Sequence, residues 1–172
     1  TVRVRMHDMK QETELPSLLD AAIAAAQRGA RVGLIFNTVD AAQNIALALR
    51  AQTKITVDLF HSRYMFIDRQ KREMEVMNNY GPMADRRRGR ILVATQVVEQ
   101  SLDLDFDWLI TELCPVDLLF QRIGRMHRHL ISCRPDGFET PWVDVFIPSE
   151  QDYGVSGFIY GDTRIKKKKK KL

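Results

Sequence analysis

The chain is short of cysteine, long apolar runs and export signals, and each shortage excludes a class of protein. Its two cysteines among 172 residues, Cys114 and Cys133, form no Cys-x-x-Cys pair, so we expect neither a disulfide framework nor a thiolate metal site. No apolar run is long enough to cross a bilayer, and the first residues form no apolar signal segment. We therefore expect a cytoplasmic protein without a membrane partner.

The sequence also lacks the parts that a self-sufficient nucleotide hydrolase needs. It has no Gly-x-x-x-x-Gly-Lys-Ser/Thr loop to cradle a triphosphate and no Asp-Glu pair to hold Mg²⁺. Asp103, Asp105 and Asp107 are spaced like the first ligands of a calcium loop. That interpretation fails because Trp108 stands where the loop needs glycine and Cys114 where it needs glutamate. We expect no metal bound by this chain, and no nucleotide hydrolysis by it alone.

The positive charge of the chain is concentrated at one end. The run Lys166–Lys171 outweighs the whole formal net charge of +4, so the pI of about 9.2 is not evidence of nucleic-acid binding. We interpret residues 166–172 as an added or edited end, with a natural DNA-binding tail as the alternative. The remaining sequence divides into one domain over 1–150 and the start of a following segment over 151–165.

Short apolar strand patterns alternate with helical patterns along the chain. Such alternation is typical of parallel β-α-β units and predicts an α/β fold with a mainly parallel sheet. Strands are predicted over residues 2–6, 32–36, 55–60, 91–94, 108–111 and 142–147. Helices are predicted over 16–28, from a cap at residue 37 or 38 onward, over 65–79, and after Pro115.

Polar clusters directly follow three of the predicted strands. They are Asn37-Thr38, His61-Ser62-Arg63 and Thr95-Gln96. Because ligands bind outside the carboxyl ends of parallel strands, we expect these clusters to converge on one edge of the sheet. Their hydroxyl, amide and guanidinium groups suit the oxygens of a phosphate chain. The alternative is that each cluster is an ordinary turn.

Three arginines lie close together within residues 121–129. If the helix after Pro115 continues through this stretch, Gln121, Arg125 and Arg128 share one face. The opposite, buried face then carries Val116, Leu119, Ile123 and Met126. Guanidinium groups held on a packed helix suit phosphate oxygens, while the alternative is an amphipathic helix with a solvated basic face.

Two stretches resemble motifs of superfamily 2 helicases. Residues 90–107 resemble motif V, and residues 121–128, Gln-Arg-x-Gly-Arg-x-x-Arg, resemble motif VI. The spelling Glu-Gln-Ser-Leu-Asp-Leu-Asp-Phe-Asp within motif V, with Arg-His closing motif VI, resembles the CRISPR-associated helicase-nuclease of type I systems. Residues 37–39 and 61–63 fit that family's motifs IV and IVa, although Ser101 replaces a glycine common in motif V.

The resemblance extends from about residue 15 to 163 and implies a role for individual residues. It implies a RecA-like three-layer domain that forms the second helicase lobe. Arg125 and Arg128 would be arginine fingers toward the γ-phosphate of ATP-Mg²⁺ held mainly by a first lobe, and Gln121 would orient the attacking water. Asp103 and Arg122 would join the two fingers in nucleotide binding. The single-stranded DNA backbone would contact Asn37, Thr38, Ser62, Arg63, Thr95 and Gln96. Asp105 and Asp107 we interpret as structural.

The resemblance further implies a larger protein that degrades foreign DNA in CRISPR interference. Such a protein carries a metal-dependent nuclease domain and a first RecA-like lobe before this lobe, and a C-terminal domain after it. A guide-RNA surveillance complex recruits it to single-stranded DNA, where it translocates with ATP, and we expect it to act as a monomer. Two alternatives stay open: a non-catalytic RecA-like module that docks a protein partner, and a lobe of another superfamily 2 DNA or RNA helicase.

Overall fold

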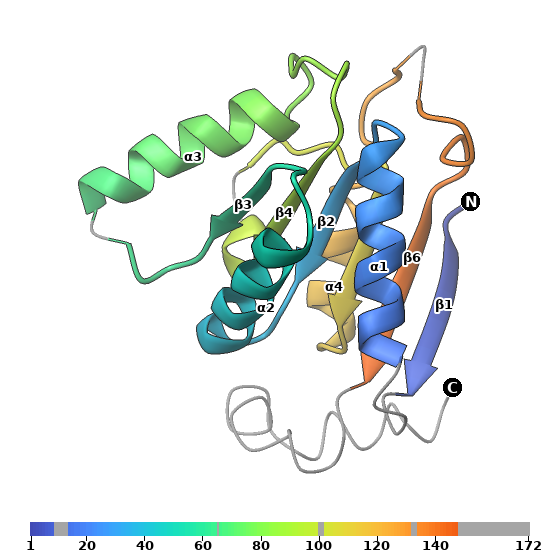
Figure 1. The fold of residues 1–172 in the computed structure, drawn as a ribbon, viewed down its shortest axis with the longest axis horizontal. Coiled ribbons are helices and arrows are strands. Elements are labelled where there is room, and N and C mark those ends of the chain that lie inside the picture. Colours follow the sequence, from blue (N-terminus) through green and yellow to red (C-terminus); the bar gives the residue numbers. More distant parts are fainter. Residues whose placement is uncertain (9–13, 65, 100–101, 132–133, 148–172) are drawn as a thin grey trace.

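A single six-stranded sheet runs through the molecule, with strand order β1-β6-β5-β2-β4-β3 and every neighbouring pair parallel (Figure 1). The computed structural model describes residues 1–8, 14–64, 66–99, 102–131 and 134–147. The predicted parallel α/β fold is confirmed, and each predicted strand is present with bounds shifted by at most a few residues. The strands are β1 (Arg3–Asp8), β2 (Arg31–Ile35), β3 (Val57–Phe60), β4 (Arg90–Ala94), β5 (Trp108–Glu112) and β6 (Trp142–Ile147).

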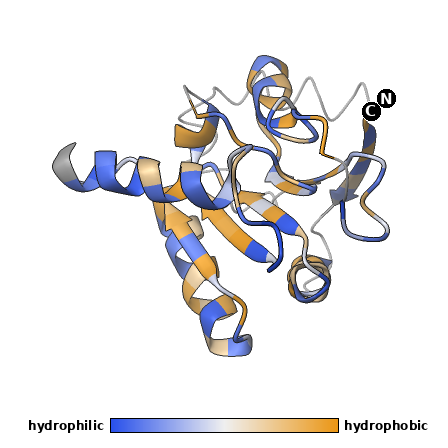
Figure 2. Ribbon diagram, turned by 90° about the horizontal axis from the view of Figure 1, so that it is seen from above, coloured by the Kyte–Doolittle hydropathy of each residue, from blue (hydrophilic) through white to orange (hydrophobic). Residues whose placement is uncertain are grey.

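Helices cover both faces of the sheet and give three layers. α1 (Glu14–Gln27) and α2 (Val39–Gln52) pack on one face, whereas α3 (Phe66–Tyr80) and α4 (Val116–Ile123) lie on the other (Figure 1). Seen from above, the strands, whose ribbons are coloured largely as hydrophobic residues, lie between these two helical layers (Figure 2). A short 3₁₀ turn, η1 (Gln96–Glu99), follows β4.

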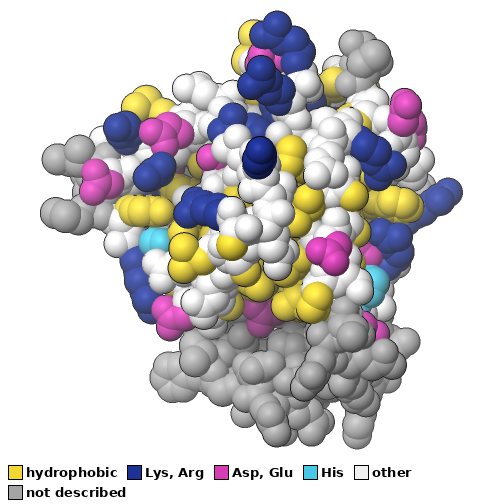
Figure 3. Space-filling model, in the orientation of Figure 1, with side chains coloured by type: hydrophobic (Ala, Val, Ile, Leu, Met, Phe, Trp, Pro, Cys, Tyr) yellow, Lys and Arg dark blue, Asp and Glu magenta, His cyan; other side chains and the backbone are white. Residues whose placement is uncertain are grey.

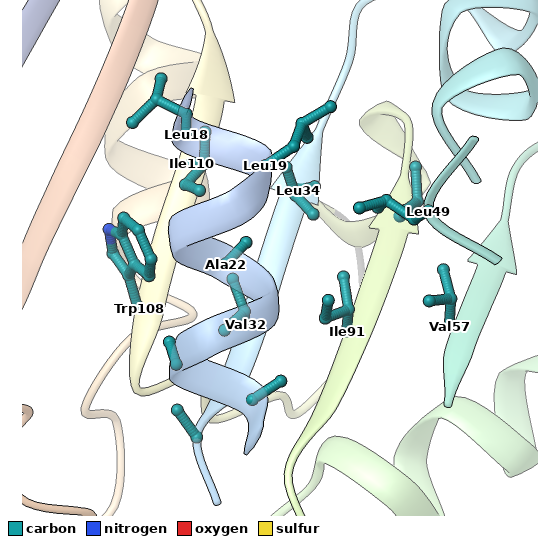
Figure 4. Packing of buried hydrophobic residues seen from close by; sticks show 14 of the residues in the cluster. Leu18, Leu19, Ala22, Val32, Leu34, Leu49, Val57, Ile91, Trp108 and Ile110 are labelled. Atoms are coloured by element: carbon teal, nitrogen blue, oxygen red, sulfur yellow. The ribbon is translucent and has the colours of Figure 1, made fainter. Parts of the chain in front are cut away.

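The larger apolar cluster fills the space between α1, α2 and the sheet. Leu18 and Ala22 of α1 pack among Val32 and Ile110 of the central strands (Figure 4). Every residue of β2 and β5 is buried, because a central parallel strand is covered on both faces. The rigid central strands therefore hold the turns at their ends in fixed positions.

α2 begins at the residue that the sequence favours as a cap. The Thr38 hydroxyl oxygen accepts a hydrogen bond from the Ala41 backbone N–H at 3.2 Å. This contact satisfies one of the donors that the first turn of a helix leaves unpaired. The predicted start of this helix is confirmed.

α4 ends earlier than the sequence predicts. It stops at Ile123 with Gly124 as its C-cap, so Arg125 and Arg128 do not share one helix face with Gln121, and that prediction is wrong. The cause is a contact with a distant segment: Phe106 donates its backbone N–H to the Arg125 carbonyl at 2.8 Å and accepts from His127 N–H at 3.2 Å.

The predicted buried face of α4 is also only partly right. Met126 is buried, but Val116 is 45% exposed at the first turn.

On the face covered by α1 and α2, Lys and Arg side chains lie in separated groups among acidic and apolar ones (Figure 3). No helix of the described residues is both long enough and apolar enough to span a bilayer. The predicted segments 151–165 and 166–172 lie outside the described residues.

Candidate functional site

The three polar clusters lie side by side at the carboxyl edge of the sheet, as the sequence predicts. They follow β2, β4 and β3, which are neighbours in that order. Thr95 donates its backbone N–H to the Phe60 carbonyl at 3.2 Å, and the Gln96 side chain donates to the Asn37 carbonyl at 2.9 Å. These bonds join the ends of the three strands into one polar edge.

The six residues predicted to contact DNA differ in how accessible they are. Ser62 and Arg63 are exposed, and Arg63 pairs with Asp40 at 2.7 Å. Thr38 and Gln96 are partly exposed.

Asn37 and Thr95 are the two inner members of this set, with only 2% and 1% of their surfaces exposed. The Thr95 hydroxyl is buried without a hydrogen-bond partner among the described residues. A buried polar group without a partner is uncommon in native proteins. It marks Thr95 as a place where a donor or acceptor is missing.

His61 contacts the Ser62-Arg63 turn that follows it. The sequence predicted no separate role for this residue. Its Nδ1 accepts the Arg63 backbone N–H at 3.2 Å, and its ring stacks on Tyr64 with centroids 4.3 Å apart. Its Nε2 lies 3.2 Å from the Gln43 amide. Burial and the charge of Arg63 lower the pKa of His61, so the ring stays neutral and Nδ1 remains an acceptor.

The stability of this turn is expected to fall in mild acid. Because the folded pKa of His61 lies below the unfolded value, the unfolded chain takes up a proton first as pH falls. Stability is therefore full above the unfolded pKa and is lost progressively from there down to the folded pKa. Thermal unfolding between about pH 7.5 and about pH 5.5 should show a smaller loss in His61→Gln than in the unsubstituted chain. An equal loss in both chains would assign the effect to other groups.

Arg122 is fully buried and joins the polar edge to α4. Its Nε donates to Glu99 Oε1 at 2.7 Å, and its Nη2 donates to Asn37 Oδ1 at 3.1 Å. Its Nη1 donates to the Thr111 hydroxyl at 2.8 Å and to the Glu112 carbonyl at 3.1 Å. Burial raises the pKa of Glu99, and the charge of Arg122 opposes that rise.

This arrangement corrects two expectations from the sequence. Arg122 is predicted to contact the nucleotide, but its surface is 0% exposed and each nitrogen of its guanidinium has an internal acceptor. Asn37 is predicted to contact DNA, but its amide accepts from Arg122 and donates to the Leu113 carbonyl at 2.9 Å. In this structure both side chains make internal hydrogen bonds that connect the ends of the strands to η1 and α4. The missed partner is Glu99, for which the sequence offered only its place within motif V.

Beyond α4, Arg125 and Arg128 come together beside Asp103. Arg128 Nε lies 3.0 Å from Asp103 Oδ1, and His129 Nε2 lies 2.9 Å from the same oxygen. Arg125 donates through Nη1 to the Leu102 carbonyl at 2.5 Å and through Nη2 to the Glu99 carbonyl at 2.8 Å. We call Asp103, Arg125, Arg128 and His129 the arginine cluster. Gln121 is exposed on the preceding helix.

The arginine cluster carries an excess of positive charge. Burial and the nearby charge of Arg128 lower the pKa of Arg125, while Asp103 raises it. The two arginines outnumber the one carboxylate of the cluster, so its charge favours an anionic ligand over a neutral one.

Asp105 and Asp107 are structural, as the sequence analysis interprets them. Both are fully buried, and Arg134 reaches Asp105 at 2.9 Å and Asp107 at 2.6 Å. Arg86 pairs with Asp107 at 2.7 Å, and Asp107 also accepts the Arg31 backbone N–H at 2.8 Å. Within the part of the chain that the structure describes, no group of three acidic, histidine or cysteine side chains could hold a metal ion.

The all-parallel sheet with helices on both faces defines the fold class. The fold matches the C-terminal domain of the DEAD-box protein Dbp5 with a TM-score of 0.61 over 94% of this chain and 86% of that one, at 13% identity. Likeness at this identity concerns the fold alone. It is the RecA-like fold of a helicase C-terminal lobe.

The family follows from more similar proteins. Residues 28–130 match the family model described as CRISPR-associated nuclease/helicase Cas3, C-terminal, and the chain belongs to that family. It is 50% identical over 151 residues to the CRISPR-associated endonuclease/helicase Cas3 of Escherichia coli (strain K12), covering 87% of this chain and 17% of that protein. It is 38% identical to the corresponding Streptococcus thermophilus protein, covering 92% and 17%. The chain thus spans about a sixth of these relatives.

Solved structures agree with this assignment. The T. fusca Cas3-AMPPNP crystal structure matches with a TM-score of 0.78 at 32% identity, over 88% of this chain and 19% of that one. A chain of a CRISPR RNA-guided surveillance complex in a pre-nicking state matches with a TM-score of 0.77 at 31% identity, over 92% and 21%.

Proposed function

We propose that this chain is the second RecA-like lobe of an ATP-dependent single-stranded DNA translocase and nuclease of type I CRISPR interference. The observation that carries the proposal is the buried Arg122, which joins the polar carboxyl edge to the helix that leads into the arginine cluster. A lobe that couples a nucleotide to DNA needs two such surfaces with a rigid connection between them. The names of the relatives support the same function.

On the nucleotide side, Arg125 and Arg128 act as arginine fingers toward the γ-phosphate of ATP-Mg²⁺. The sequence has no phosphate-cradling loop, so the nucleotide is bound mainly by the first RecA-like lobe of the same polypeptide. Arg128 exchanges Asp103 for phosphate, because the triphosphate carries more negative charge than one carboxylate. Asp103 is then available to the ribose, and exposed Gln121 orients the attacking water.

On the DNA side, the backbone of a single strand lies along the polar carboxyl edge. Ser62 and Arg63 are its outer donors, with Thr38 and Gln96 beside them. Thr95 is 1% exposed, so its unpartnered hydroxyl would bond a phosphate only after DNA binding moves the residues that cover it. Contacts to backbone alone make binding independent of sequence and weaker at high salt.

The other domains of the proposed translocase lie in the rest of the polypeptide, and its recruitment depends on a guide-RNA surveillance complex. We assign residues 1–150 to the lobe, 151–165 to the start of the next segment and 166–172 to an added end. The nuclease metal belongs to a separate N-terminal domain. The pre-nicking surveillance complex that contains a similar chain supports recruitment by a guide-RNA complex.

The test is ATP turnover with single-stranded DNA, measured on this chain alone and on the chain joined to its first lobe. We expect no turnover from the chain alone and DNA-stimulated turnover from the joined polypeptide. Folding of both samples is checked by circular dichroism. If the joined, folded polypeptide is also silent, the chain acts instead as an interaction module. In that case the exposed Phe120 of α4, at 67%, is the first place to look for a protein contact.

A further inference from the structure

His127 stands between the two arginines of the arginine cluster and has an unusual backbone conformation. Its φ is 44°, and it is the sole non-glycine residue of the described chain with positive φ. Side chains with a Cβ rarely adopt this left-handed conformation, although histidine and asparagine do so more often than most. Such a conformation persists when the surroundings hold it in place.

Contacts from one neighbouring segment hold His127 there. Its backbone N–H donates to the Phe106 carbonyl at 3.2 Å. Burial and the charge of Arg134 lower the pKa of the His127 imidazole, and a hydrogen bond from the ring to the Asp107 backbone opposes that fall, so the backbone group is the carbonyl acceptor. Nε2 is buried without a partner among the described residues, so the ring donates through Nδ1.

The left-handed turn decides where the next residue points. Directly after it, the Arg128 backbone N–H donates to Asp105 Oδ1 at 3.2 Å. The Arg128 side chain then reaches Asp103 at 3.0 Å. A helical or extended φ at His127 would direct Arg128 away from both carboxylates.

We propose that His127 is a positioning residue for Arg128. Its left-handed backbone, anchored by the ring to the Asp107 carbonyl, aims the Arg128 guanidinium at the nucleotide. The inference rests on the proposed function of Arg128. It adds a residue that touches neither ATP nor DNA and acts through its neighbour.

Three substitutions in the whole protein separate the backbone from the ring. Asn tolerates positive φ, and its amide N–H occupies the place of the ring Nδ1–H, so His127→Asn should keep kcat within about threefold. Gly keeps the backbone freedom but loses the anchor, so His127→Gly should give an intermediate kcat. His127→Ala loses both and should lower kcat by about tenfold or more with little change in KM for ATP. Thermal unfolding of each variant is recorded in parallel.

A double-mutant cycle with Arg128→Ala shows whether the effect passes through Arg128. We expect His127→Ala to have no further effect on turnover once Arg128 is absent. If His127→Ala lowers turnover equally in both backgrounds, or if Asn fails as badly as Ala, the positioning role is wrong while the finger role stands. If Arg128→Ala itself turns over ATP normally, the proposed role of Arg128 fails and this inference fails with it.

Discussion

Arg125→Ala in the whole protein is expected to lower DNA-stimulated ATP turnover by about 10³-fold or more, the size of effect that arginine fingers have in other phosphoryl-transfer systems. The transferred phosphoryl group spreads negative charge over its oxygens, and the guanidinium stabilises that charge without proton transfer. Here Arg125 is held by the carbonyls of Glu99 and Leu102, so it is positioned before any nucleotide arrives.

The loss should come from chemistry and not from unfolding. Removing the side chain costs two hydrogen bonds to carbonyls, so we expect a destabilisation of about 1–3 kcal/mol. The matched control is Arg87→Ala, which removes an exposed arginine whose partner is Asp85, far from the carboxyl edge. Turnover is measured under saturating ATP and DNA, with thermal unfolding alongside. Normal turnover in a folded Arg125→Ala protein would remove the arginine-finger assignment.

Among the proposed substitutions, Glu99→Ala is expected to lower the free energy of unfolding the most, by about 3–5 kcal/mol. Arg122 is 0% exposed and Glu99 side chain 5% exposed, so the substitution leaves a buried cation without its counter-charge. Urea unfolding of this chain measures the change directly, provided the slope stays constant. The matched control is Glu75→Ala, which breaks a surface pair with Arg72 and should cost less than about 1 kcal/mol.

A second variant shows whether that loss comes from the missing attraction between Glu99 and Arg122 or from leaving the Arg122 charge buried without a partner. Glu99→Leu combined with Arg122→Met removes both charges and keeps much of the volume, so it should be less destabilised than Glu99→Ala alone. If the double variant is the less stable of the two, the pair contributes more through attraction than it costs in desolvation. If Glu99→Ala unfolds at the same urea concentration as the original chain, the Glu99–Arg122 pair does not contribute to the stability of the fold.

Local patterns in the sequence were enough to predict the sheet and the convergence of the three polar clusters on its carboxyl edge. Each strand combines an apolar run with a turn signal, and the order of strands and helices requires parallel pairing. The polar edge followed from that order, because Asn37, Ser62 and Thr95 each come directly after a strand. These features depend on residues close together in the chain, so a single sequence suffices to predict them.

The contacts that the sequence did not predict join residues far apart in the chain. Arg122 looks like one more basic residue on an amphipathic helix, because its acceptors Glu99 and Asn37 lie 23 and 85 residues away. The end of α4 was missed for the same reason. Helical spacing extends past Gly124, but the Phe106 backbone pairs with Arg125 and His127 instead. The hydrogen bonds to Phe106 therefore end the helix where local helix propensity alone would have continued it.

The buried guanidinium of Arg122 has a mechanical consequence. Because it ties the ends of β2 and β5 to η1 and α4, the polar carboxyl edge and the arginine cluster are joined by one buried group and resist shifting against each other. If the lobe acts in the translocase that we propose, displacement during each cycle would arise at the joints between domains, and the lobe would transmit force as one stiff body. The number of ATP molecules spent per nucleotide advanced would then depend, in part, on how little this connection yields.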